Sequence, residues 1–199
     1  MRPGEGSRIL ILFLQYFFVV AVNIAGKSAR DTYFLSRYDR SLLPLMLAAC
    51  AIAVAMVAAL YSRTSRRLAP APLLNAANVV FLAGLLVLRT RLQGYAIPVL
   101  YVWIEVIVSI LALSFWLAAS EIFDPRQAKR LFGLIGGGGA VAAIVVGAAV
   151  KPFVKAFGSE SLLWLVMAAL AAQWALGHYS LRFAGPPPAV RPREQKPRE

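Results

Sequence analysis

Four ionisable residues lie within or beside long apolar stretches of this sequence. Lys27, Arg30 and Asp31 follow the first such stretch, and Glu105 lies in the middle of another, Tyr95–Ala119. Charged groups this close to hydrocarbon must face protein or water, where they usually serve ions or polar substrates. Lysine and arginine cations suit the oxygens of phosphate groups. These residue types therefore indicate a site for an anionic solute.

The spacing of the first group is that of a helix face. If the first apolar helix continues to about Leu35, then Asn23, Lys27 and Arg30 or Asp31 form one polar stripe that belongs against a cavity. A structural interpretation is also open. In it, Lys27 pairs with Asp31 at a helix end, and Arg30 extends to lipid phosphate groups.

Glu105 has its own polar neighbours at helical spacing. Tyr101 and Ser109 flank it at i−4 and i+4, so the three residues share a face that could hydrogen-bond a substrate or hold Glu105 beside the cations. The alternative is a structural ion pair between helices. The residues predicted to bind substrate are Lys27, Arg30, Asp31, Glu105, Asn23 and Tyr101.

The elements that position these residues are membrane-spanning helices. The sequence is 60% hydrophobic and only 15% charged, whereas charged residues make up about 25% of soluble domains. A water-soluble fold of this size could not cover so much apolar surface. We therefore expect an all-α integral membrane protein whose six apolar stretches each cross the bilayer: Ile9–Gly26, Leu42–Tyr61, Pro72–Leu88, Tyr95–Ala119, Leu131–Val150 and Ser161–Leu181.

The sequence divides into an N-terminal segment, 1–8, a six-helix membrane domain, 9–181, and a tail, 182–199, that is basic and rich in proline. A cleaved signal peptide is the alternative for the first helix, but the stretch is longer than a usual signal sequence and no small-residue cleavage site follows it. The tail lacks apolar periodicity and is expected to be disordered.

Composition argues against several classes of function. The net charge of +12 is scattered over connections and the tail instead of forming one patch, so lipid headgroups and topology explain it better than nucleic acid does. The single cysteine, Cys50, offers neither a disulfide nor a metal cluster. We expect no metal and no cofactor. An intramembrane enzyme is disfavoured because no nucleophile–base pair is evident.

Glycines cluster at the start of the fifth stretch. A phosphate-binding loop is an unlikely fit for them, because no Lys-Ser or Lys-Thr follows and the segment opens a membrane helix instead of following a strand. Small residues let helices approach closely, so we expect helix packing. The residues concerned are Gly133, Gly136, Gly137, Gly138 and Gly139.

Several short motifs are similar to those of one transporter family. They are Lys27-Ser28-Ala29-Arg30-Asp31 followed by Phe34-Leu35, Trp103-Ile104-Glu105, Phe115-Trp116, Glu121, and Gln127-Ala128-Lys129-Arg130-Leu131-Phe132-Gly133. This pattern resembles the nucleotide transporter (ATP/ADP translocase) family of bacteria and plastids, whose members resemble the major facilitator superfamily in fold.

The resemblance implies a bacterial inner-membrane carrier for phosphorylated nucleotides such as ATP and ADP, with Lys27, Arg30 and Glu105 as cavity residues. The chain supplies only the first six helices of such a carrier, so it resembles one half of a major facilitator fold. A second six-helix half would come from a partner chain, from self-association or from further residues. The alternative function is a non-transporting membrane anchor or scaffold that oligomerises or pairs with a partner.

The connection between the fourth and fifth stretches is rich in charge. Opposite the basic residues of the 63–67 connection, it could form a gate or a docking surface, although cytoplasmic anchoring by positive charge explains it equally well. The residues concerned are Asp124, Arg126, Lys129 and Arg130.

The distribution of lysine and arginine predicts that both termini face the cytoplasm. More of these residues fall on the side of the termini, and an even number of crossings returns the chain to that side. Reporter fusions should therefore be cytoplasmic after Arg67, external after Gly94 and cytoplasmic at the C-terminus. An external C-terminal reporter would contradict this orientation.

Overall fold

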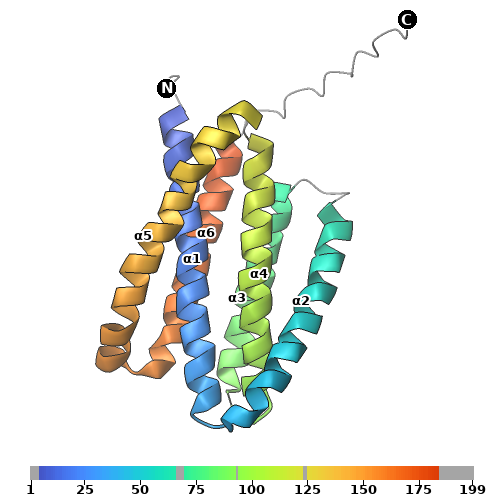
Figure 1. The fold of residues 1–199 in the computed structure, drawn as a ribbon, viewed down its shortest axis with the longest axis vertical. Coiled ribbons are helices and arrows are strands. Elements are labelled where there is room, and N and C mark those ends of the chain that lie inside the picture. Colours follow the sequence, from blue (N-terminus) through green and yellow to red (C-terminus); the bar gives the residue numbers. More distant parts are fainter. Residues whose placement is uncertain (1–4, 66–69, 93, 123–124, 184–199) are drawn as a thin grey trace, which may run out of the picture.

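The computed structural model describes residues 5–65, 70–92, 94–122 and 125–183 (Figure 1). Six helices in these ranges are long and apolar enough to cross a membrane, which confirms the predicted all-α, six-helix membrane fold. Short 3₁₀ turns, η1 (Arg40–Leu42) and η2 (Ser159–Ser161), precede the second and sixth helices. The α-helices are α1 (Glu5–Leu35), α2 (Leu43–Ser65), α3 (Pro70–Thr90), α4 (Ala96–Ile122), α5 (Pro125–Phe157) and α6 (Leu162–Phe183).

Most helices extend beyond the apolar stretches that predicted them. The connection expected over residues 124–130 is instead helical from Pro125 onward, which corrects the sequence interpretation. Proline fits the first position of a helix because its missing N–H would have no partner there. At the start of the fourth helix, the predicted span includes Tyr95, but this residue precedes α4 and is 91% exposed.

The two ends of the membrane domain also differ slightly from the prediction. α1 begins within the predicted N-terminal segment, at Glu5, and residues 182 and 183 of the predicted tail continue α6. The rest of that tail, 184–199, lies outside the described residues, so its disorder stays a prediction. Figure 1 shows that α1 begins and α6 ends at the same end of the bundle, as an even number of crossings requires.

Two helices form the centre of the bundle. α1 packs against α4, α5 and α6, whereas α4 packs against α1, α2 and α3, and α3 also meets α6. Of the residues in α2, only Met46, Cys50 and Tyr61 are buried. The contact between α1 and α4 therefore joins the two three-helix groups, and it is the place where charged residues from α1 and α4 can meet.

Small residues on α1 allow α4 to approach closely. A Cβ atom added at Gly26 would lie 3.0 Å from the Cγ2 atom of Ile104, closer than most real contacts. Ala25 and Ala29, on either side of Gly26, are completely buried, as is Ile107 on α4. Small side chains permit this approach in membranes, where dispersion contacts, not water exclusion, hold helices together.

Two glycines of α5 pack directly on α1. A Cβ atom at Gly138 would clash with the backbone oxygen of Phe13, and one at Gly139 would lie 2.6 Å from the Tyr16 ring. Both glycines are buried. The close contact of α5 with α1 therefore requires the absence of a side chain at these two positions.

The other glycines of the cluster do not share this close contact within the described chain, so helix packing at those positions stays a prediction. A Cβ atom at Gly133 or Gly136 would meet nothing within 4 Å in the described part of the chain, and one at Gly137 would make an ordinary contact. The cluster spans more than one helical turn, so its members point in several directions. Gly133 and Gly136 lie on the outward side of α5.

These two environments predict opposite effects of the same substitution. Gly138→Ala should destabilise the protein by about 1–3 kcal/mol, because the backbone of α1 must move to admit the methyl group. Gly136→Ala is the matched control and should be neutral or slightly stabilising, since alanine is the better helix former. Thermal unfolding in detergent measures both changes. Equal melting temperatures for the two variants would refute the packing assignment.

Candidate substrate-binding site

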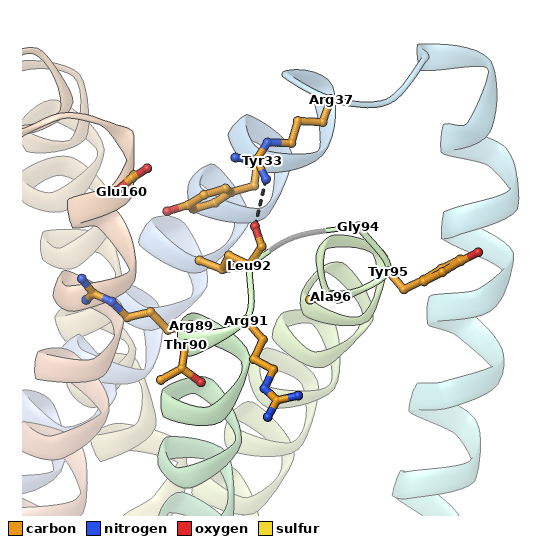
Figure 2. A pocket seen from close by; sticks show the side chains of 10 residues that line it. All are labelled: Tyr33, Arg37, Arg89, Thr90, Arg91, Leu92, Gly94, Tyr95, Ala96 and Glu160. Carbon is orange, nitrogen blue, oxygen red and sulfur yellow. Dashed lines mark hydrogen bonds between the residues drawn. The ribbon is translucent and has the colours of Figure 1, made fainter.

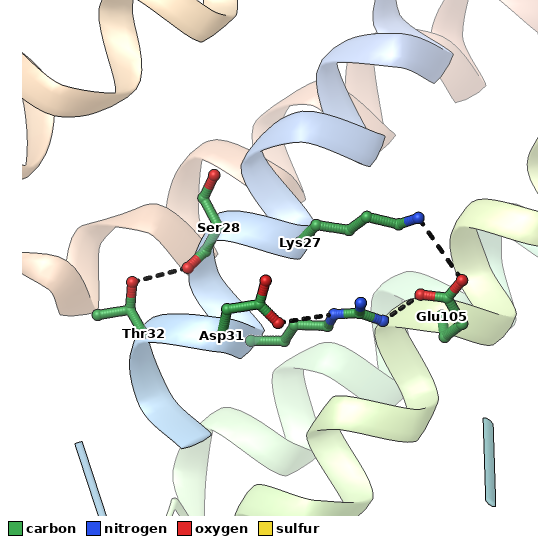
Figure 3. Close-up of polar contacts among 6 residues, drawn as sticks. Lys27, Ser28, Asp31, Thr32 and Glu105 are labelled. Atoms are coloured by element: carbon green, nitrogen blue, oxygen red, sulfur yellow. Dashed lines mark hydrogen bonds and ion pairs between the residues drawn. The ribbon is translucent and has the colours of Figure 1, made fainter. Parts of the chain in front are cut away.

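Charged residues from α1 and α4 form one connected network where these two helices pack against each other. The Glu105 carboxylate accepts a hydrogen bond from Nη1 of Arg30, and the Lys27 Nζ atom lies 3.6 Å from Oε1 of Glu105. Arg30 also donates from Nε to Oδ1 of Asp31 at 3.2 Å. Figure 3 shows Lys27 and Asp31 extending from α1, with Glu105 facing them from α4.

Burial differs sharply among the four charged side chains. Only 8% of the Arg30 side chain and 23% of the Glu105 side chain are exposed, but the values for Lys27 and Asp31 are 41% and 48%. The two positive and two negative charges cancel, which lowers the cost of keeping them within the membrane span. The network therefore has a buried Arg30–Glu105 centre and an open edge.

An aromatic ring also fixes the position of Arg30. The guanidinium carbon lies 4.3 Å from the centre of the Tyr101 ring, a cation–π distance, and Tyr101 is almost fully buried. Tyr101 lies one turn before Glu105, so both contacts come from the same face of α4. Arg30 is held by α4 on two sides, whereas Lys27 has one long ion pair.

This geometry differs from the first structural interpretation offered from sequence, a Lys27–Asp31 pair, and agrees with the second, an ion pair between helices at Glu105. Asp31 pairs with Arg30, while Lys27 pairs with Glu105 on the other helix. Arg30 is buried inside the bundle and does not extend to a lipid surface. Asp31 and Glu105 can both pair with Arg30, because the separate N–H groups of a guanidinium can reach two carboxylates at once.

The remaining predicted residues lie outside the network. Asn23, one turn before Lys27 on α1, is partly buried and takes no part in the ion pairs of the described residues. Asp124 is outside the described part of the chain. The backbone of three others is helical in α5 but their side chains are not described, so their role as a gate stays a prediction: Arg126, Lys129 and Arg130.

Sequence reasoning missed one neighbour of the network. Cys50 of α2 is buried, and the charges of Lys27, Arg30 and Glu105 all lie within electrostatic range of its thiol. Nothing in the sequence predicts which face α2 turns toward α4, so no local signal could have found this residue. In the described residues, no group of histidine, cysteine and acidic side chains could hold a metal ion.

The arrangement can bind an anion by exchange. An incoming phosphate group could take the place of the Glu105 carboxylate on Nη1 of Arg30, while Asp31 keeps Nε in position. The Lys27 side chain is 41% exposed and makes one long ion pair, so it can move to contact the anion.

Comparison with known proteins identifies the family. Residues 60–173, more than half of the chain, match a family model described as TLC ATP/ADP transporter. No curated protein and no solved structure matches the chain. The matched segment includes Tyr101 and Glu105, and it begins after Lys27 and Arg30. The resemblance predicted from the sequence motifs is confirmed at this level: the chain belongs to the TLC ATP/ADP transporter family.

Proposed function

We propose that this chain is one half of a bacterial inner-membrane carrier for a phosphorylated solute, a nucleotide such as ATP or ADP. The observation that supports it most is the Lys27–Arg30–Glu105 network, which places two cations at a half-open position inside the membrane domain. Membership of an ATP/ADP transporter family supports a nucleotide as the solute.

In the proposed mechanism the solute and Glu105 compete for the same cations. A nucleotide phosphate chain carries more negative charge than one carboxylate, so it can displace Glu105 from Arg30 and Lys27. When the solute leaves, Glu105 returns and keeps the empty site neutral. Because protonation of Glu105 would also release the cations, this residue could couple solute binding to proton movement.

A carrier of this kind needs a second half to enclose the site. Carriers with repeated halves alternate access by moving one half against the other around a central site. The open edge formed by Lys27 and Asp31 is consistent with a site that a second half completes. α2 and α5 carry large exposed apolar side chains, such as Met56 and Ile144, that such a half could cover.

The alternative is a membrane scaffold without transport. It is favoured by the outward side of α5, where open space lies beside Gly133, Gly136 and Gly147. Small residues on a lipid-facing surface permit close approach of another helix. In a pure scaffold, however, the charges of the α1–α4 network would serve stability alone and would not affect solute binding.

Removing one cation distinguishes the two functions. Lys27→Gln should weaken nucleotide binding by the assembled protein by about tenfold or more, because a charge-assisted contact to phosphate is lost. Folding should be largely retained, since Lys27 is 41% exposed. The matched control is Arg63→Gln, which removes an exposed cation from the end of α2. Calorimetric titration with ATP and ADP in detergent measures both variants. Unchanged affinity in Lys27→Gln would favour the scaffold.

Glu105 should compete with the solute for Arg30 and Lys27. Glu105→Gln removes the competing charge, so nucleotide affinity should rise several-fold. The melting temperature of the empty protein should fall at the same time, because the buried Arg30 loses its main partner. Calorimetric titration with ATP and ADP and thermal unfolding in detergent measure the two effects. Unchanged or weaker affinity in the folded variant would show that Glu105 does not compete with the solute.

A further inference from the structure

A basic cavity lies at the end of the bundle where α1 and α3 finish and α4 begins (Figures 1 and 2). It has a volume of about 1090 Å³ and shares no lining residue with the Lys27–Arg30–Glu105 network. Its position is opposite the end at which α1 begins. The residues that line it are Tyr33, Arg37, Arg89, Thr90, Arg91, Leu92, Gly94, Tyr95, Ala96 and Glu160.

The charges around this cavity are unbalanced. Three arginines line it, and Glu160 is the one acidic residue of the lining. Figure 2 shows Arg91 extending away from Tyr33, so Arg37 and Arg89 are the cations that lie nearest to that ring. The charges of Arg37, Arg89 and Glu160 all act on the Tyr33 hydroxyl group. The lining therefore combines two guanidinium groups and a phenol, with a net positive charge.

Arg89 has a donor that the described protein does not satisfy. Its guanidinium lies 3.8 Å from the centre of the Trp164 ring, which fixes its position by a cation–π contact. Its Nη1 atom is nevertheless buried and has no hydrogen-bond partner among the described residues. Leaving a buried charged donor unpaired is costly, so such an atom calls for an acceptor. Arg89 lines the cavity, so a small shift of its guanidinium would let an anionic oxygen there supply this acceptor.

The opposite wall is fixed by hydrogen bonds between two connections. Arg37 donates from Nη1 to the backbone oxygen of Leu92 at 2.9 Å, and Tyr38 donates from its hydroxyl to the backbone oxygen of Gly94 at 3.0 Å. Gly94 has a φ of 52°, a left-handed conformation that glycine adopts without strain. Arg37 uses one of its five N–H groups in this contact, which leaves others for a ligand.

We propose that this cavity binds a phosphate-bearing anion, with Arg37 and Arg89 donating to its oxygens and the Tyr33 hydroxyl adding a third donor. Arginine is the residue best suited to phosphate, because its planar fork matches two oxygens at once. The anion is either a free phosphorylated solute or the headgroup of an anionic phospholipid, since both present the same oxygens. Glu160 weakens binding by repulsion. This proposal does not depend on the function proposed for the Lys27–Arg30–Glu105 network.

The first test uses pyrophosphate as a free anion, titrated into the protein in neutral detergent. All variants are compared in the Lys27→Gln background, which weakens binding at the Lys27–Arg30–Glu105 network and keeps what remains of it the same in each protein. Arg37→Gln should weaken binding about tenfold, the effect of losing one charge-assisted contact. Lys155→Gln, which removes an exposed cation near the end of α5, is the control and should leave the affinity unchanged.

A substitution with the opposite sign separates binding from structural damage. Glu160→Gln should strengthen pyrophosphate binding several-fold, because it removes the only negative charge of the lining. Glu160→Gln should not disturb folding, because Glu160 is exposed. Arg37 is also exposed, but Arg37→Gln removes its hydrogen bond to the Leu92 backbone, so the gain in affinity on Glu160→Gln is the readout that structural damage cannot produce. Arg89→Gln is less informative, since the loss of its contact with Trp164 could itself destabilise the protein.

The second test examines a lipid headgroup in nanodiscs. The melting temperature is compared between phosphatidylcholine alone and phosphatidylcholine containing phosphatidylglycerol. A stabilisation by the anionic lipid that Arg37→Gln removes and Glu160→Gln increases would assign the site to lipid. The same pattern with pyrophosphate would assign it to a free solute. If neither ligand responds to these two substitutions, the proposal is wrong.

Discussion

The ion pair between Arg30 and Glu105 is the contact on which the centre of this bundle depends. It joins α1 to α4, whose packing, together with that of α3 on α6, holds the two three-helix groups together. The same carboxylate also holds Lys27, and the same guanidinium holds Asp31. Removing Glu105 would therefore leave the buried Arg30 paired only with Asp31. This should destabilise the protein more than replacing the whole ion pair with apolar residues would. This constraint links the stability of the bundle to the chemistry of the site.

The charged network and the basic cavity draw residues from one continuous segment of the chain. Two residues of the basic cavity, Tyr33 and Arg37, follow Lys27 and Arg30 by the length of one to three helical turns. One continuous run of chain therefore contributes cations to the network and to the cavity. Their electrostatics differ. The Lys27–Arg30–Glu105 network has no net charge, because carboxylates pair with its cations, whereas the basic cavity has an excess of positive charge. An anion could bind in the basic cavity without displacing a carboxylate. To bind at the Lys27–Arg30–Glu105 network, it would have to displace Glu105.

Much of the fold and part of the site could be predicted from sequence. Apolar length predicted six spans, because it measures partition into hydrocarbon directly. It failed at boundaries such as Pro125, where capping and not hydropathy decides. The spacing of Lys27 and Arg30 predicted their common face, but the rotation of α4 that gives Glu105 to Arg30 depends on packing at Gly26. The basic cavity combines three separate stretches of the chain, 33–37, 89–96 and the region of Glu160, so no local pattern around Arg89 could predict it.

The separation of Arg30 and Glu105 by 75 positions has a consequence for biosynthesis. A ribosome delivers α1 to the membrane well before α4, so Lys27, Arg30 and Asp31 reach the bilayer without the carboxylate that later neutralises them. Only the neighbouring Asp31 can compensate Arg30 at that stage. Charges at membrane depth make the insertion of a helix less favourable. α1 should thus stay near the insertion machinery, or shifted toward the surface, until α4 emerges and the two helices insert as a pair.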